Sequence, residues 1–295
     1  MSIIEKALDK SRTRPRQGTG SGDERSAPFG VAAPAPEPSR SKQVHIDFAW
    51  LRKQGIVIPG EERSSIAEEF RIMKRPLLNN AFGRHSAMQI PRGRLIMVTS
   101  ALPREGKTFT ATNLALSIAQ ELDRTVLLVD ADVARPAIPI TMGFEADRGL
   151  MDVLTDPGID LPDVLLRTNL ENLTILPAGR PHGRSTEILA SDVMMRLIND
   201  LHERYDDRVI LFDSPPLLAT SEPGVLASHM GQVIMVVDAD RTPAASVEQA
   251  MEQLQSCDVV LSALNRAPAL PGLGYYYGGS YYHGREHEVP ARAGA

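Results

Sequence analysis

The 295-residue sequence lacks several features that would assign it to large protein classes. It has one cysteine, Cys257, which excludes an intramolecular disulfide framework and a cysteine-rich zinc site. It has no run of 18 or more apolar residues, so no transmembrane helix is expected. Its net charge is −5, whereas a dedicated nucleic-acid binder is usually basic. The first ten residues form no secretory signal, and we expect a cytoplasmic protein that binds no nucleic acid.

Aromatic residues are also scarce, at 5%, yet five of the six tyrosines fall within residues 275–282. The apolar share of 42% is ample for a core. Polar, glycine-rich and proline-rich composition at both ends predicts three parts: a flexible N-terminal segment and linker (1–43), a folded domain (44–266) and a flexible tyrosine-rich tail (267–295). Within the first part, residues 2–10 carry a short helical stripe, typical of a fraying terminus or of a small docking helix.

Strands and helices alternate through the folded domain. A helix is expected from Ser64 to Phe82, with Pro76 as a point of breaking or bending. Further on, the pattern predicts strands at 95–99, 125–129, 173–176, 208–212, 232–237 and 259–264, and helices at 108–122, 185–205, 223–228 and 244–256. This order is typical of an α/β fold with a mostly parallel, twisted sheet flanked by helices on both faces.

A phosphate-binding loop is predicted at residues 101–108, Ala-Leu-Pro-Arg-Glu-Gly-Lys-Thr, between the first of these strands and a helix. Gly106 lets the backbone approach a phosphate, and backbone N–H groups at the helix N-terminus attract the anion. Lys107 can reach the β- and γ-phosphates, and the Thr108 hydroxyl can bind Mg²⁺. Ala101 replaces the usual first glycine of this motif.

Carboxylates follow two more strands of the predicted sheet. Asp130 and Asp132 come after residues 125–129, and Asp213 comes after 208–212. Ligands of open α/β sheets bind at this edge, where carboxylates can hold Mg²⁺ or accept a hydroxyl proton. Asn265 ends the last strand, where it is either a turn residue or a hydrogen-bonding partner for a nucleobase.

Four stretches together resemble the bacterial tyrosine kinases (BY-kinases) of exopolysaccharide synthesis: VTSALPREGKTFTATNLA, LLVDADVARP, LPAGRPHGRSTEIL and VILFDSPPLL. The resemblance covers residues 64–266 and the tyrosine tail, and it implies a P-loop NTPase of the MinD/ParA-like type. The opening MSIIEKALDKSR resembles the subgroup of tyrosine autokinases linked to exosortase-type loci.

The resemblance implies a role for each matching residue. Lys107 and Thr108 match Walker A, Asp130 and Asp132 match Walker A′, and Asp213 matches Walker B. Catalysis is assigned to Lys107, Asp130, Asp132 and Asp213, with Asp130 nearest the incoming tyrosine hydroxyl. Mg²⁺ is assigned to Thr108, Asp132 and Asp213, and ATP to Arg104, Glu105, Gly106, Lys107, Thr108, Phe109 and Asn265. The implied autophosphorylation sites are Tyr275, Tyr276, Tyr277, Tyr281 and Tyr282, and the implied ring-forming oligomerisation motif is Glu68, Arg71 and Lys74.

The chain departs from the family pattern in three places. Lys74 replaces an arginine, with Arg75 beside it, and lysine is a poorer bidentate partner. Ala134 replaces another arginine, with Arg135 next to it. The sequence carries no fused transmembrane adaptor, so the resemblance implies a separate membrane activator of the chain-length-determinant type and a peripheral place at the inner membrane.

Two other functions remain open on the sequence. One is a partitioning or division-site ATPase, but such proteins carry a signature lysine where this chain has Leu102. The other is a non-catalytic, nucleotide-binding scaffold of a polysaccharide export complex. Lys107, Thr108 and the three aspartates are all present, which disfavours a scaffold whose nucleotide site is inactive.

Overall fold

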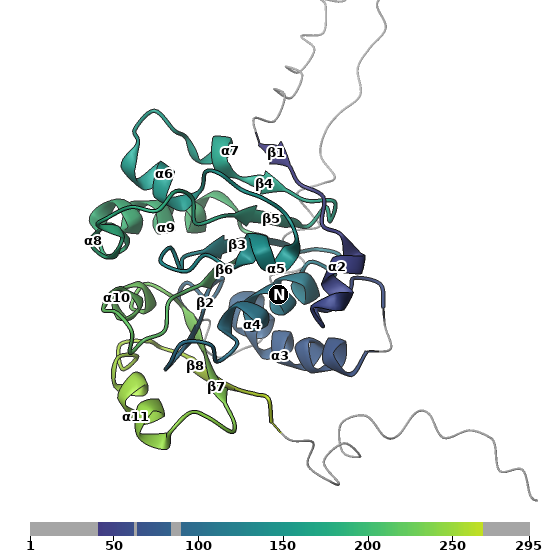
Figure 1. The fold of residues 1–295 in the computed structure, drawn as a ribbon, viewed down its shortest axis with the longest axis vertical. Helices are drawn as coiled ribbons and strands as arrows, with labels where there is room; N and C mark the ends of the chain where they lie inside the picture. Colours follow the sequence, from purple (N-terminus) through teal and green to yellow (C-terminus); the bar gives the residue numbers. More distant parts are fainter. Residues whose placement is uncertain (1–40, 62–63, 84–89, 268–295) are drawn as a thin grey trace, which may run out of the picture. The chain divides into compact units, whose positions relative to one another are not determined.

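The fold is built on one sheet, seen in a computed structural model that describes residues 41–61, 64–83 and 90–267. Its eight strands lie in the order β1-β4-β5-β3-β6-β2-β7-β8 (Figure 1). They are β1 (Lys42–Gln43), β2 (Leu95–Ser100), β3 (Thr125–Asp130), β4 (Leu166–Arg167), β5 (Leu173–Leu176), β6 (Arg208–Asp213), β7 (Gln232–Asp238) and β8 (Val260–Asn265). Every pairing is parallel except that of β4 with β5. The predicted mostly parallel α/β sheet is confirmed.

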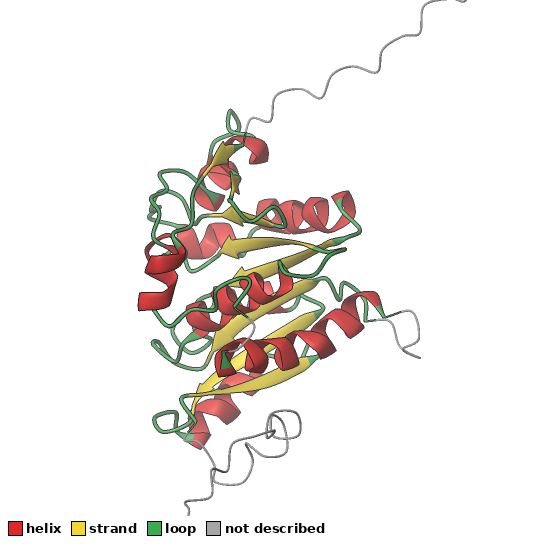
Figure 2. Ribbon diagram, turned by 90° about the vertical axis from the view of Figure 1, so that its right-hand side faces the viewer, coloured by secondary structure: helices red, strands yellow, loops and turns green. Residues whose placement is uncertain are grey.

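Helices cover both faces of this sheet (Figure 2). One face packs against α2 (Phe48–Lys53), α3 (Ser65–Phe82), α4 (Lys107–Ile118) and α5 (Ile138–Met142). The other packs against α6 (Leu150–Thr155), α7 (Leu161–Val164), α8 (Ser185–Leu189), α9 (Asp192–Arg204), α10 (Glu222–Ala227) and α11 (Ala244–Glu252).

The central strands are apolar on both faces, as parallel strands between helices must be. In β2, Leu95 and Met97 belong to one core cluster, while Ile96 and Val98 belong to the other, and none of the four is exposed. This alternation follows from the two-residue period of a strand. It fixes the register that brings the carboxyl ends of β2, β3 and β6 together.

The predicted single helix at 185–205 is wrong, because the chain breaks between α8 and α9. Ser191 has an extended backbone (φ −89°, ψ 162°), and its hydroxyl donates to the Ile188 carbonyl at 2.7 Å. Asp192 then begins α9, where its charge favours the helix N-terminus. The apolar periodicity continues across this break, which is why it predicts one helix.

Two other predicted helices end early. The helix expected to reach residue 122 ends at Ile118, and the one expected to reach 256 ends at Glu252. Beyond α4, Asn172 donates its side-chain amide to the Ala119 and Glu121 carbonyls, at 3.3 and 3.0 Å. Such side-chain partners satisfy backbone groups that no further helical turn supplies.

The helix expected at 64–82 is confirmed, and it runs unbroken through Pro76. Pro76 and Ile72 both lie on the exposed side of α3, where water can replace the N–H that the Ile72 carbonyl loses at the proline. The elements β1, α2, α5, α6, α7 and β4 have no counterpart in the predicted pattern, and β1 lies two residues before the expected domain start. The tail tyrosines and the stripe at residues 2–10 lie outside the described residues.

No helix in the described ranges has the length and apolar content needed to cross a bilayer.

Candidate nucleotide and phosphotransfer site

The loop between β2 and α4 has the backbone of a phosphate-binding loop. Two of its residues have positive φ, Arg104 at 69° and Gly106 at 98°. The backbone angle of Gly106 favours glycine, and a Cβ atom there would lie 2.1 Å from Nδ2 of Asn265 and would displace that amide. Lys107 begins α4, which places its ammonium beside the helix N-terminus that attracts anions.

The side chain of Glu105 holds the loop in this shape. It is buried and accepts a hydrogen bond from the Leu102 N–H at 2.8 Å and another from the Thr242 hydroxyl. Thr242 also accepts a hydrogen bond from the Asp238 N–H at 3.0 Å, which ties the loop to the end of β7. Glu105 therefore acts as a positioning residue that holds the loop in place through these two hydrogen bonds.

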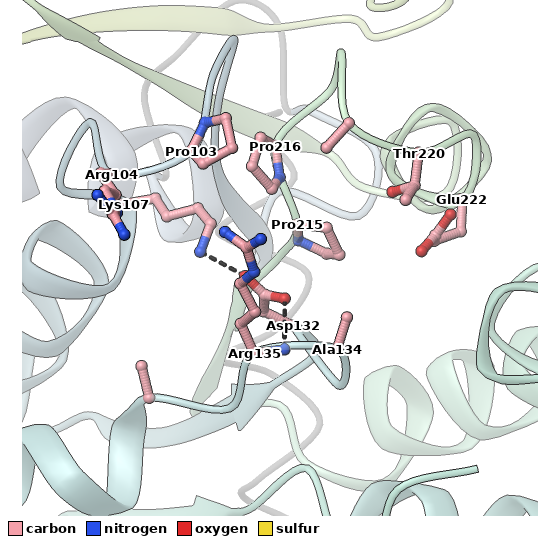
Figure 3. Close-up of a pocket in the computed structure, with 12 residues that line it drawn as sticks. Pro103, Arg104, Lys107, Asp132, Ala134, Arg135, Pro215, Pro216, Thr220 and Glu222 are labelled. Carbon is pink, nitrogen blue, oxygen red and sulfur yellow. Dashed lines mark hydrogen bonds and ion pairs between the residues drawn. The ribbon is translucent and has the colours of Figure 1, made fainter. Parts of the chain in front are cut away.

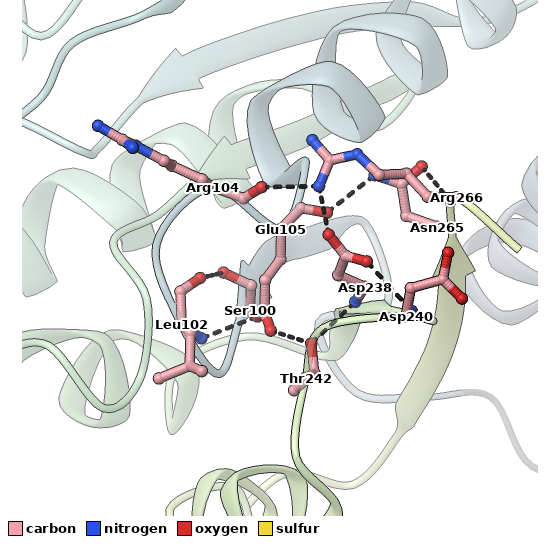
Figure 4. Close-up of polar contacts among 9 residues, drawn as sticks. All are labelled: Ser100, Leu102, Arg104, Glu105, Asp238, Asp240, Thr242, Asn265 and Arg266. Atoms are coloured by element: carbon pink, nitrogen blue, oxygen red, sulfur yellow. Dashed lines mark hydrogen bonds and ion pairs between the residues drawn. The ribbon is translucent and has the colours of Figure 1, made fainter.

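The end of β8 holds the same loop through its backbone (Figure 4). Asn265 donates its side-chain amide to the Glu105 carbonyl at 2.8 Å. Arg266 donates to the Arg104 carbonyl at 3.1 Å and forms an ion pair with Asp238. Asn265 was predicted to contact the nucleotide, and the structure places its amide against the backbone of the predicted phosphate-binding loop.

A pocket of about 610 Å³ opens beside the loop (Figure 3). Its lining comes from the loop, from the segment after β3 and from the segment after β6: Pro103, Arg104, Lys107, Asp132, Ala134, Arg135, Ala137, Pro215, Pro216, Ala219, Thr220 and Glu222. Within it, Lys107 Nζ donates to Asp132 Oδ2 at 2.6 Å. The predicted Lys107 and Asp132 thus meet at one wall of a cavity at the carboxyl edge of the sheet.

Lys107 remains cationic in this setting. Burial lowers the pKa of its ammonium, but the nearby carboxylates of Asp213, Asp132 and Asp130 outweigh burial and raise the pKa above its ordinary value. A protonated lysine is the form that can neutralise phosphate oxygens. Asp213 and Asp132 therefore keep Lys107 in the charged form that phosphate binding would require.

Asp130 and Asp213 are register partners at the carboxyl ends of β3 and β6. Both are fully buried. Burial raises the pKa of Asp130 to about 8, helped by the charge of Asp213 and opposed by the N–H groups of Ile138 and Ala137. Burial also raises the pKa of Asp213 to about 6, opposed by Lys107 and the nearby Thr108 hydroxyl.

Three carboxylate oxygens at this edge accept no hydrogen bond: Oδ1 of Asp130 and both oxygens of Asp213. Buried and unpaired oxygens of this kind suit a hard cation such as Mg²⁺. No group of three or more His, Cys, Asp or Glu side chains in the described part of the chain forms a complete cage.

The structure separates the two aspartates of the Asp-Ala-Asp sequence. Asp132 lines the pocket, whereas Asp130 lies behind it, with Oδ2 accepting the N–H groups of Ala137 and Ile138, both at 3.1 Å. The predicted cofactor residue Phe109 turns away as well, because its ring packs edge-on against Phe70 of α3, with centroids 6.2 Å apart.

The three predicted oligomerisation residues lie on α3 but face different ways. Glu68 and Arg71 form a half-exposed ion pair. Lys74 is buried, and its ammonium lies 2.6 Å from Glu121 Oε1 and donates to the Ser117 carbonyl at 2.7 Å. The exposed cation at this point of the helix is Arg75.

Several residues of the site carry no motif. Thr242, Asp238 and Arg266 lie near the ends of β7 and β8, and Glu222 begins α10. In the sequence, the only signal for these residues is that each follows an apolar strand or begins a short helix. The structure alone shows that they converge on the loop and the pocket.

Comparison with known proteins gives a consistent result. The AAA domain family matches residues 94–265. The chain is 27% identical to the tyrosine-protein kinase YwqD of Bacillus subtilis, over 70% of this chain and 82% of that protein. It is 33% identical to the putative tyrosine-protein kinase EpsB of Ralstonia nicotianae, over 65% of this chain but only 26% of that longer protein. Among solved structures, the VpsO kinase domain is 34% identical, with 68% of this chain and 95% of that one covered and a TM-score of 0.56.

Proposed function

The chain belongs to the bacterial tyrosine kinase family, with a P-loop domain of the AAA type, and we propose that it is an ATP-dependent autokinase that phosphorylates its own C-terminal tyrosines in trans. The observation that carries this proposal is the pairing of Lys107 with Asp132 inside a pocket closed by a phosphate-binding loop. The acceptors are Tyr275, Tyr276, Tyr277, Tyr281 and Tyr282.

Phosphoryl transfer needs positioning and charge neutralisation more than covalent chemistry. The loop backbone and Lys107 hold the β- and γ-phosphates. Mg²⁺ would supply further positive charge to offset the charge of the phosphates, and Thr108, Asp132 and Asp213 are the residues that would hold it or its waters. Arg104 and Arg135 line the same pocket and add cationic side chains.

The acceptor hydroxyl must lose its proton to a nearby base. Asp132 is the Walker A′ carboxylate that faces the pocket, so we assign proton acceptance to Asp132 in preference to Asp130. Asp132 becomes available when nucleotide phosphates take its place beside Lys107. Asp130 then acts as a positioning residue that holds the following segment through the N–H groups of Ala137 and Ile138.

The wider role that we propose is regulation of exopolysaccharide synthesis and export. The kinase would act in the cytoplasm, held at the inner membrane by a separate chain-length-determinant-type activator. Subunits would assemble in a ring through α3, with Glu68 and Arg71 at the contact. Because Lys74 is buried, Arg75 supplies the third charged side chain of that surface.

Transfer in trans is tested with two full-length chains. One, the kinase, has all five tail tyrosines replaced by phenylalanine, and the other, the acceptor, carries Lys107→Met. Phosphotyrosine on the acceptor in the presence of Mg-ATP is the expected result. Absence of label in the mixture, with strong labelling of the unaltered chain alone, would show that transfer occurs within one subunit.

A further inference from the structure

Glu222 is a buried acidic side chain at the end of the pocket away from the phosphate-binding loop. It is 4% exposed and lines the cavity, across Pro215 from Arg104 and Lys107 (Figure 3). Its Oε2 atom is shielded from solvent and accepts no hydrogen bond. Its Oε1 atom has one distant donor, the Thr186 hydroxyl at 3.4 Å.

A carboxylate in that condition is unfavourable until a donor reaches it. The other acidic side chain in the pocket lining, Asp132, already has Lys107 as its partner. The cationic residues of the lining, Arg104, Lys107 and Arg135, lie at the phosphate end. The pocket is therefore polarised, with one end suited to an anion and the Glu222 end suited to a cation.

The wall between these ends is apolar. Pro215, Pro216 and Ala219 line it and offer a surface on which an aromatic ring can pack. A tyrosine whose ring lies there would have its hydroxyl toward Lys107. An extended peptide with its tyrosine in this position can place a residue three positions along the chain, about 10 Å away, at the Glu222 end of the pocket.

We propose that Glu222 recognises a cationic side chain placed a few residues after the phosphorylated tyrosine of the acceptor. The inference rests on the proposed autokinase function and adds a determinant of substrate choice. The tail contains such a cation, because Arg285 follows Tyr282 by three residues and Tyr281 by four. Arginine is always charged and binds a carboxylate through two parallel hydrogen bonds, so Arg285 is the residue that Glu222 selects.

The test uses the tyrosine-free kinase and the Lys107→Met acceptor described above. The kinase is prepared with and without Glu222→Gln, and the acceptor with and without Arg285→Gln, which gives a double-mutant cycle. We expect Glu222→Gln to raise KM for the acceptor about tenfold, with kcat and KM for ATP within about twofold. The Arg285→Gln acceptor should show the same rise with the unaltered kinase and no further rise with the variant.

A purely structural role predicts a different pattern. Glu222→Gln would then slow both acceptors by the same factor, or would change KM for ATP, and either outcome overturns the proposal. Thr186→Val is the matched control, because it removes the contact with Glu222 but leaves the carboxylate; it should leave the preference for Arg285 intact. If Glu222→Gln fails to fold, a charge swap replaces it: Glu222→Lys paired with an Arg285→Glu acceptor must restore the lost rate.

Failure of the two proposals can be told apart. If the kinase without Glu222→Gln labels no tyrosine of the acceptor, transfer in trans falls, and this inference with it. If the acceptor is labelled and the two substitutions act independently, only the role of Glu222 falls.

Discussion

Lys107 Nζ lies 2.6 Å from Asp132 Oδ2, so the phosphate-binding lysine is already neutralised by a carboxylate in the nucleotide pocket. Both side chains are largely buried, at 11% and 5% exposure, so separating them leaves a buried charge that needs a new partner. An incoming γ-phosphate must compete with Asp132 for the same ammonium. This relationship links nucleotide binding to the release of the carboxylate that we assign as proton acceptor.

Replacement of Asp132 separates binding from chemistry. In Asp132→Asn, ATP without Mg²⁺ should bind several-fold more tightly, because no anion competes for Lys107. With Mg²⁺, the rate of tyrosine phosphorylation should fall by about 100-fold or more. Titration calorimetry and phosphotyrosine assays check the two effects. Weaker binding of free ATP by this variant would show that the pair does not compete with the nucleotide.

Replacement of Asp213 should stabilise the ligand-free protein. Its pKa is raised from 3.8 to about 6, so folding favours the protonated acid, and stability falls as pH rises from about 4 to 6. Asp213→Asn removes that cost, which is about 3 kcal/mol above pH 6 and vanishes below pH 4. Denaturant unfolding at pH 4 and pH 8 measures it. The exposed Asp206, changed to Asn, is the control, and equal gains at both pH values would contradict the account.

Lys74 should matter for stability and Arg75 for assembly. Lys74→Met removes the partner of the Glu121 carboxylate and of the Ser117 carbonyl. It should lower the free energy of unfolding by about 2 kcal/mol. Arg75→Gln, on the exposed side, should change stability by no more than about 0.5 kcal/mol but weaken self-association. Thermal unfolding and light scattering distinguish the two. If the Lys74→Met variant were monomeric but unchanged in stability, Lys74 would have to be assigned to the subunit contact instead.

Asn265 should contribute equally to the affinity for different nucleotides, whatever their base. Because its amide donates to the Glu105 carbonyl at 2.8 Å, Asn265→Ala should loosen the loop and weaken ATP and GTP by the same several-fold factor. Direct binding of both nucleotides measures the ratio. A loss confined to ATP would instead assign Asn265 to the base, as the sequence suggests.

The sequence predicts the parts of this fold that are long and strongly apolar. Strands β2, β3, β6 and β7 are buried on both faces, and such runs stand out against polar neighbours. The two-residue strands β1 and β4 leave no periodic pattern, and the break at Ser191 is a local capping event within a continuing apolar stripe. Short elements and caps are decided by tertiary contacts that no window of sequence contains.

The residues of the candidate site also differ in how far the sequence predicts them. Lys107, Thr108, Asp132 and Asp213 are predicted from motifs, because phosphate binding constrains residue types at fixed spacing. Which aspartate faces the pocket does not follow, since Asp130 and Asp132 occupy equivalent strand-end positions in the sequence. Glu222 is found only when the chain is folded, because it comes from a separate helix.

The most direct test of the central claim is a map of phosphotyrosine by mass spectrometry after incubation of the intact chain with Mg-ATP. We expect phosphate on tyrosines within residues 275–282 and none in Lys107→Met. Hydrolysis of ATP with no modified tyrosine, even in the presence of a candidate membrane activator, would contradict this claim and identify the protein as an ATPase switch.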